Sequence, residues 1–140
     1  MTDNERLLGE HACIRLCHDF AASVDARRYD DFVALFTVDG VFDRAGQISH
    51  GHAEIRRFLD ARPADRVTRH ACTNICVDLV SPDSAVGNCY ALVFQVQGTD
   101  TPPGPLHSPA PMVVEYHDQY RRGPEGWKFN HRRVKIVFQP

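Results

Sequence analysis

The distribution of apolar residues constrains the fold most, because helical spacing fills the first half of the chain and strand-like runs fill the second. Residues 5–28 contain no proline and carry apolar side chains at every fourth position over most of their length. This spacing predicts one long amphipathic helix. Shorter helices are predicted over 29–36 and 51–62, the latter ended by Pro63.

A hairpin is predicted between the second and third helices. Asp39-Gly40 favours a turn, and the strands of the hairpin occupy Val41–His50 with Ala45-Gly46 at the bend.

Four longer strands are predicted in the second half from runs of β-branched and aromatic residues, over 67–80, 85–96, 112–121 and 127–138. The Pro-rich stretch from Gly98 to Pro111 joins the second and third of them. It includes the segment from Pro102 to Pro111, whose role the sequence leaves open. A connection this long is either a functional flap or a mobile excursion.

Helices followed by a run of antiparallel strands indicate an α+β fold with the helices packed on one face of a curved sheet. A curved sheet of this kind wraps a pocket. The 140 residues fit one domain, 1–140, since domains have roughly 100 to 200 residues.

Charge and composition narrow the function classes. Sixteen basic against eighteen acidic side chains leave a formal charge of -2, which does not favour nucleic acid or an anionic membrane as partner. Charges among the leucines of residues 1–10 and the lack of an 18-residue apolar run predict a cytoplasmic protein. The five cysteines are interpreted as buried reduced thiols.

Two pairs of cysteines, Cys13 with Cys17 and Cys72 with Cys76, at first sight provide four thiol ligands for a zinc ion. The second pair lies on a predicted strand, where residues four apart are separated by roughly 13 Å. The pairs therefore cannot share one ion, and we predict no metal site.

The predicted strand over 67–80 carries the first candidate for chemistry. Alternation places His70, Cys72, Asn74 and Cys76 on one face. A polar face is normally solvated, but cysteines favour the interior, so this face also fits a cavity wall. His70 is then a candidate general base.

Asp25 is the natural partner of His70, because it lies beside the apolar stripe at the C-terminal end of the first helix. An anion is disfavoured at that end by the helix dipole, so another group should compensate it. A carboxylate there could orient the imidazole and stabilise its protonated form. The alternative is an aspartate that ends the helix in water.

Further candidates come from strand alternation and charge. Tyr116 shares one face with Asp118 and Tyr120 and is our choice for a hydrogen bond to a ligand. Asn74 shares the His70 face, and Arg44 near the pocket mouth could bind a carboxylate or phenolate. Arg132 and its neighbour Arg133 are expected to form surface pairs.

Five segments together resemble the SnoaL-like branch of the nuclear transport factor 2-like superfamily: Phe20–Phe32, Asp39–Asp43, Thr68–Asn74, Glu115–Tyr120 and Gly126–Phe129. The resemblance covers nearly the whole chain. Within that superfamily the chain looks most like scytalone dehydratase and hexachlorocyclohexane dehydrochlorinase, which are cofactor-free lyases with an Asp–His pair.

The resemblance implies a cone-shaped α+β barrel with a mixed, mainly antiparallel sheet wrapped around three N-terminal helices and a deep apolar pocket. It places Asp25 and His70 on the catalytic positions of the family. It also implies a small-molecule substrate, no cofactor, and a homodimer or homotrimer.

The substrate-positioning residues depart from those families. The two positions of the scytalone dehydratase tyrosines correspond to Val24 and Arg44, and its second pocket histidine corresponds to Gln95 or a neighbour. A polar residue of the dehydrochlorinase pattern corresponds to Phe20. The base is retained while the groups that select a substrate differ.

Two functions from different classes follow. The first is a lyase or isomerase for a small apolar cyclic or aromatic molecule. The second is a non-catalytic protein that binds a ligand in the same pocket or a partner on its sheet, such as the β subunit of a ring-hydroxylating dioxygenase.

Overall fold

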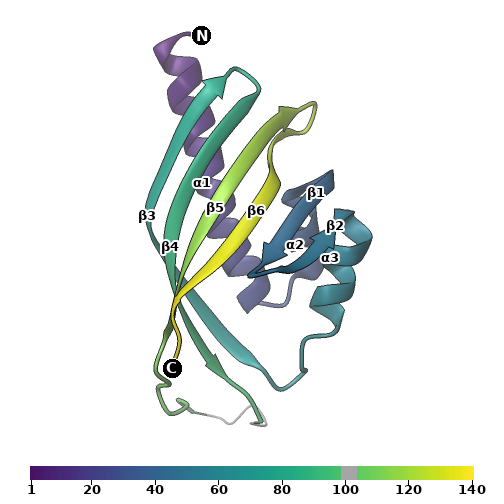
Figure 1. The fold of residues 1–140 in the computed structure, drawn as a ribbon, viewed down its shortest axis with the longest axis vertical. Coiled ribbons are helices and arrows are strands. Elements are labelled where there is room, and N and C mark those ends of the chain that lie inside the picture. The colour runs from purple at the N-terminus through teal and green to yellow at the C-terminus, as the bar shows by residue number, and fades with distance from the viewer. Residues whose placement is uncertain (99–103) are drawn as a thin grey trace.

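The computed structural model describes residues 1–98 and 104–140 and consists of three helices and one six-stranded sheet (Figure 1). In chain order the elements are α1 (Asp3–Asp25), α2 (Tyr29–Ala34), β1 (Phe36–Arg44), β2 (Gln47–His50), α3 (Gly51–Asp60), β3 (Val67–Ser81), β4 (Ser84–Val96), β5 (Met112–Gly123) and β6 (Gly126–Phe138).

The strand order is β2-β1-β6-β5-β4-β3, and neighbouring strands are antiparallel except for β1 and β6. The sheet is therefore mixed and open, with β2 and β3 at its edges. The helices lie together on one face of the curved sheet (Figure 1). The predicted α+β class with a curved, mainly antiparallel sheet around three helices is confirmed, although the sheet does not close into a barrel.

Helix α1 begins at a capping box, in which Thr2 and Glu5 each accept a hydrogen bond from the backbone N–H of the other. Its buried face contains Leu16, Phe20 and Val24. The helix ends at Asp25, three residues earlier than the apolar spacing predicts. Its last residue thereby lies beside the first residues of β3.

The β1–β2 hairpin is confirmed, with Ala45 and Gly46 both at positive φ in its turn. The predicted turn at Asp39-Gly40 is wrong, because both residues lie inside β1. The register with β6 shifts between Phe36 and Val41, so the strand bulges there and continues. A Cβ on Gly40 would lie 2.9 Å from the carbonyl oxygen of Thr37, which explains the glycine.

A second bulge, in β3, changes which alternate residues of the strand point inward. Asn74 has a φ of 53°, and the pairing with β4 shifts between Thr73 and Cys76. His70 keeps the predicted inward face, but Asn74 and Cys76 are exposed. The predicted alternation is therefore correct only up to the bulge, and Asn74 is not a wall of the pocket. Cys76 is likewise not a buried thiol.

Gly87 on β4 lies against this bulge, and we expect Gly87→Ala to lower the free energy of unfolding by about 1–3 kcal/mol. An added Cβ would lie 2.6 Å from the backbone oxygen of Cys76, which cannot rotate away. Urea unfolding measures the loss. Gly123→Ala is the matched control, because a Cβ there meets no atom of the described residues within 4 Å. Equal stabilities of the two variants would contradict the tight contact.

The core between α1 and the sheet is built from aromatic rings. Phe20 lies at its centre, with ring centroids between 4.6 and 6.5 Å from five others, namely Phe32, Phe36, Phe42, Tyr116 and Phe129. Tilted and edge-on ring pairs of this kind add to the burial of apolar area. Four members of this cluster, Phe20, Phe32, Phe42 and Tyr116, also form part of the wall of a cavity between the helices and the sheet.

The Pro-rich connection after β4 is only partly described, because residues 99–103 lie outside the described residues. The interpretation of this loop as a flap or a mobile excursion therefore stays a prediction. Leu106 and Pro109 from its second part line a shallow cleft with Val67, Phe94 and Val96.

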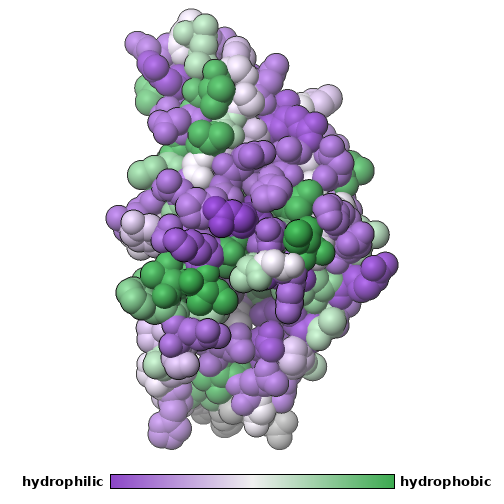
Figure 2. Space-filling model, in the orientation of Figure 1, coloured by the Kyte–Doolittle hydropathy of each residue, from purple (hydrophilic) through white to green (hydrophobic). Residues whose placement is uncertain are grey.

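No helix in the described ranges is long and apolar enough to cross a membrane. Apolar side chains gather on the outer face of the sheet where β4, β5 and β6 converge (Figure 2). Large exposed apolar residues on these strands include Val86, Tyr90 and Phe138.

Candidate active site

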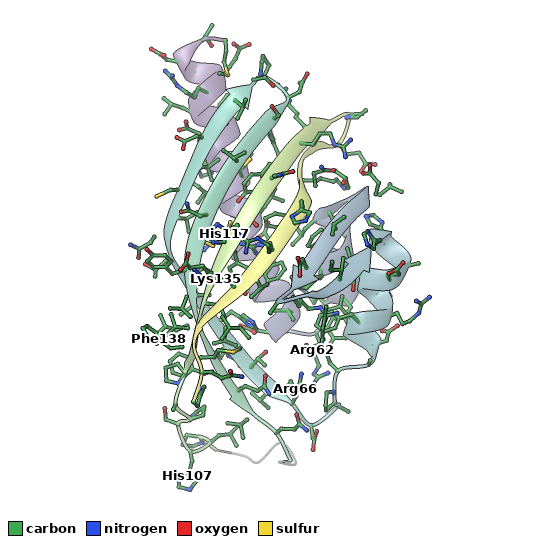
Figure 3. All side chains as sticks on the ribbon, viewed as in Figure 1. Arg62, Arg66, His107, His117, Lys135 and Phe138 are labelled. Atoms are coloured by element: carbon green, nitrogen blue, oxygen red, sulfur yellow. The ribbon has the colours of Figure 1, made fainter. Side chains whose placement is uncertain are left out.

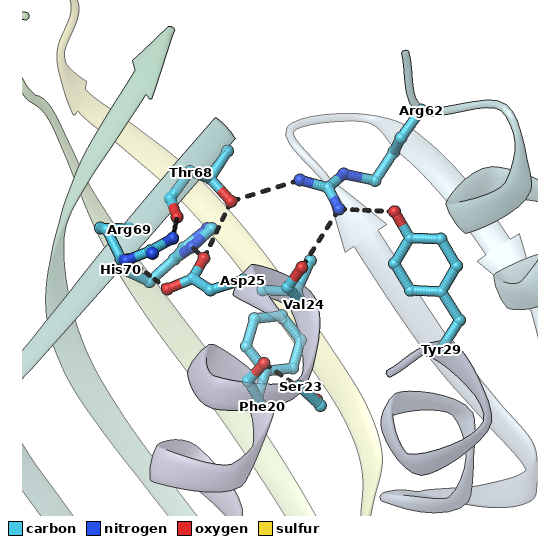
Figure 4. Close-up of polar contacts among 9 residues, drawn as sticks. All are labelled: Phe20, Ser23, Val24, Asp25, Tyr29, Arg62, Thr68, Arg69 and His70. Atoms are coloured by element: carbon cyan, nitrogen blue, oxygen red, sulfur yellow. Dashed lines mark hydrogen bonds and ion pairs between the residues drawn. The ribbon is translucent and has the colours of Figure 1, made fainter. Parts of the chain in front are cut away.

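Asp25 at the end of α1 meets His70 on β3 (Figure 4). The Asp25 Oδ1 atom lies 2.7 Å from His70 Nδ1, and Oδ2 accepts a bond of 2.8 Å from the His70 backbone N–H. The Thr68 hydroxyl donates to Oδ1 at 2.8 Å. Only 13% of the His70 side chain and 12% of the Asp25 side chain are exposed, so water competes weakly for these bonds.

The carboxylate is held in its charged form. Burial raises the pKa of Asp25, but the hydrogen bonds from the His70 ring, the His70 backbone and Thr68 outweigh burial and bring the pKa below its usual value. These hydrogen-bond donors stabilise the Asp25 anion and so offset the helix dipole, which disfavours a negative charge at the C-terminal end. Asp25 is therefore ionised at neutral pH.

An ionised Asp25 fixes the tautomer of the neutral imidazole. It accepts the Nδ1 proton, which leaves Nε2 unprotonated and able to accept one. In the described part of the chain no residue hydrogen-bonds to Nε2, and His70 lines a cavity. The pair has the arrangement of a general base and its orienting carboxylate.

Acid is expected to weaken the contribution of Asp25 to stability. A lowered folded-state pKa means that the contribution is complete above the unfolded-state value near 3.8 and disappears as the pH falls through the folded-state value. The stability difference between wild type and Asp25→Asn should therefore shrink as the pH falls below about 4. Urea unfolding at several pH values measures it. A difference independent of pH would contradict the assignment.

Arg62, in the segment after α3, connects to this pair through Thr68. Its Nη2 donates to the Thr68 hydroxyl oxygen at 3.3 Å, and its Nη1 donates to the Tyr29 hydroxyl at 2.8 Å and to the Val24 carbonyl at 3.3 Å (Figure 4). Neither Thr68 nor Arg62 is among the site residues predicted from the sequence. Thr68 could have been found, since it lies two residues before His70 and therefore on the same strand face.

The cavity beside the aromatic core has a volume of about 260 Å³. Its wall is mostly apolar. The apolar side chains come from all three helices and from the sheet: Phe20, Val24, Phe32, Phe42, Phe58, Val93, Met112, Val114, Val134 and Ile136. His70 and Thr68 are among its few polar side chains. An apolar cavity with a few convergent polar groups is the usual form of a small-molecule site.

The structure brings most of the predicted site residues to this cavity. Tyr116, Arg44 and Gln95 line it together with His70, whereas Asn74 does not. Tyr116 is buried, and Gln95 is an exposed residue of the wall. Burial raises the pKa of the Tyr116 phenol, so the hydroxyl stays protonated and able to donate.

The expected surface position of Arg132 is wrong. Arg132 is completely buried and lies opposite Asp118 in the β5–β6 register. Its Nε donates to Asp118 Oδ1 at 2.8 Å and its Nη2 to Oδ2 at 3.2 Å. The guanidinium lies over the rings of Tyr116, Phe20 and Phe129, at 3.8, 4.3 and 4.4 Å from their centroids. A paired charge thus lies directly behind the cavity wall.

Three potential metal ligands, Cys17, Cys89 and Asp118, have ligand atoms within 4.8 Å of one another. The Arg132 guanidinium already occupies their centre, with Nη2 3.6 Å from the Cys17 sulfur and 3.4 Å from the Cys89 sulfur. A hydrogen bond from Cys89 and the charge of Arg132 outweigh burial and lower the pKa of Cys17 to about 7. This cluster is therefore arranged around an internal cation and not around an open metal position.

An open curved sheet covered by helices on one face, with an apolar cavity between them, is the nuclear transport factor 2-like cone fold. The chain belongs to the SnoaL-like domain family, whose profile matches residues 5–133. No functionally curated protein matches the chain at a significant level of sequence similarity.

Solved structures with this fold match over nearly the whole chain. A scytalone-dehydratase-like protein of Novosphingobium aromaticivorans is 20% identical, with a TM-score of 0.83, and the match covers 98% of this chain and 89% of that one. Hexachlorocyclohexane dehydrochlorinase type 3 of Novosphingobium barchaimii is 22% identical, with a TM-score of 0.80 and coverages of 98% and 92%. An aromatic-ring-hydroxylase-like protein of Novosphingobium aromaticivorans is 25% identical, with a TM-score of 0.77 and coverages of 95% and 92%. At such identities the first two likenesses establish the fold alone.

Proposed function

We propose that the protein is a cofactor-independent lyase or isomerase that acts on a small cyclic or aromatic molecule, with His70 as general base and Asp25 as its positioning partner. The observation that carries this proposal is the 2.7 Å contact between Nδ1 and Oδ1 at the wall of an apolar cavity. The similarity to dehydratase-like and dehydrochlorinase structures supports it.

In this mechanism Nε2 of His70 removes a proton from a ring carbon of the substrate. The electron pair of that C–H bond forms a double bond, and a hydroxide or halide departs from the neighbouring carbon with the electrons of its own bond. Asp25 stabilises the imidazolium that forms. Tyr116 also lines the cavity and keeps its hydroxyl proton, and we assign to it the role of hydrogen-bond donor to a substrate oxygen that gains negative charge.

Proton abstraction can be tested without knowing the natural substrate. Hydroxylated and halogenated one- and two-ring compounds are incubated with the protein in D₂O and followed by ¹H NMR. The expected result is enzyme-dependent loss of one C–H signal by exchange, or formation of an alkene with release of water or halide. Compounds that bind the protein in calorimetry but neither exchange nor eliminate would count against a catalytic role and favour a ligand-binding protein.

We also propose that the protein self-associates. Exposed apolar side chains on β4 and β6, including Tyr90 and Phe138, form surface that a monomer would leave in water. Analytical ultracentrifugation distinguishes a dimer or trimer from a monomer.

A further inference from the structure

The cavity has a charge pattern that the proposed proton abstraction does not use. Arg44, Arg62 and Arg66 all line it, and no aspartate or glutamate is among its described lining residues. Asp25 lies behind His70 and does not reach the cavity wall. The described lining therefore carries three positive charges, and the nearest carboxylates, Asp25 and Asp43, lie outside it.

Arg44, at the end of β1, is the most incompletely paired of these arginines. Its guanidinium lies 3.5 Å from the centroid of the Phe58 ring on α3. Its two Nη atoms donate to neutral acceptors, the Gln47 amide oxygen at 3.2 Å and the Ser49 hydroxyl oxygen at 3.4 Å. Its buried Nε–H has no hydrogen-bond partner among the described residues. Burial lowers the pKa of Arg44 against the opposing effect of Asp43, yet a guanidinium remains charged at any physiological pH.

Arg62 and Arg66 add further positive charge to the cavity wall. Both lie on the segment that joins α3 to β3, and Figure 3 shows them close together. Arg62 donates to the hydroxyl oxygens of Tyr29 and Thr68 and to one backbone carbonyl. Arg66 donates to the amide oxygen of Gln97 at 3.0 and 3.2 Å. Within 1–98 and 104–140, none of the three arginines forms an ion pair.

Partly desolvated guanidinium groups with only neutral acceptors retain most of their capacity to bind an anion. The flat guanidinium fork matches the two oxygens of a carboxylate. A cavity of roughly 150 Å³ accommodates one benzene molecule, so the 260 Å³ here leaves room for a substituted or fused ring. The apolar wall fits the ring, and the arginines fit one charged group on it.

We propose that the molecule bound in this cavity is a one- or two-ring carboxylic acid whose carboxylate is held by Arg44, with Arg62 and Arg66 adding to the positive field. This inference rests on the proposed function for the identity of the site and adds the substrate class. The ring then lies against the aromatic core, and His70 approaches a ring carbon remote from the carboxylate. A doubly charged phosphate would lose more hydration energy in so apolar a cavity.

Equilibrium binding of a non-reacting pair of ligands tests the proposal. Isothermal titration calorimetry at neutral pH compares 2-naphthoate with 2-naphthamide, which has the same shape and no charge. Hydrogen bonds to a charged group favour the ionised ligand, so we expect naphthoate to bind about tenfold to hundredfold more tightly. We expect Arg44→Gln to remove at least about tenfold of that preference while the affinity for the amide changes little.

Arg133→Gln is the matched control, because it removes the same charge from an exposed position on β6 that does not line this cavity. Arg66→Gln provides a second variant with a smaller expected loss in case Arg44→Gln unfolds. Equal binding of naphthoate and naphthamide by the wild type, or loss of the preference in Arg133→Gln as in Arg44→Gln, would overturn the proposal. Neither ligand needs to react, so this result is independent of whether the protein proves to be a lyase.

Discussion

Replacing Arg132 by methionine is expected to lower the free energy of unfolding by about 3–5 kcal/mol. The substitution preserves much of the apolar volume against Phe20 and Tyr116 but leaves Asp118 buried and without its cation. Removing one partner of a buried ion pair is costly because the remaining charge has lost both water and its counter-charge. Urea unfolding followed by circular dichroism measures the change.

Two further variants define the origin of this loss. Arg133→Met, at the exposed neighbouring position, should change stability by no more than about 0.5 kcal/mol. The double variant Arg132→Met with Asp118→Leu should recover most of the loss, since an apolar replacement of the whole pair leaves no unpaired charge. If the double variant is as unstable as the single one, packing and not charge is what Arg132 contributes.

Replacing His70 by alanine is expected to lower turnover of a verified substrate by about 10²- to 10⁴-fold, which is the usual contribution of a positioned general base. Asp25→Asn should also lower turnover, because an amide cannot stabilise the imidazolium as a carboxylate does. The rate constant kcat measures both effects under saturating substrate.

Thr73→Ala is the control for the strand, since Thr73 is three residues from His70 and exposed on the other face of β3. It should leave kcat and the folded state unchanged. Full turnover by His70→Ala, with the protein folded, would remove the proposed base from the mechanism.

The sequence predicts the helices and the long strands of this fold well, because both depend on periodic burial. It fails where the backbone departs from periodicity. Asp39-Gly40 has the local chemistry of a turn, yet pairing with β6 on both sides keeps it within β1 as a bulge. Asn74 tolerates a positive φ, but whether that property produces a bulge depends on the pairing partner on β4.

The same distinction applies to the site. Asp25 and His70 could be paired from the sequence because a helix end and an inward strand position were each locally recognisable, and family resemblance aligned them. Arg132 was misplaced because a charged residue on a strand is usually solvated, and only its partner keeps it inside. Folding the hairpin about the Gly123–Gly126 turn alone would place Asp118 opposite His131, and it is the register shift between Gln119 and Tyr120 that brings Asp118 opposite Arg132.

The groups around the cavity are attached to two different parts of the molecule. His70 and Asp25 are carried by β3 and α1, whereas Arg44 and Phe58 are carried by β1 and α3, at the opposite end of the strand order. Substitutions or short insertions in the β1–β2 hairpin and in α3 can therefore reshape one side of the cavity without moving the His70–Asp25 pair. The choice of ligand and the arrangement of this pair can thus change independently of each other.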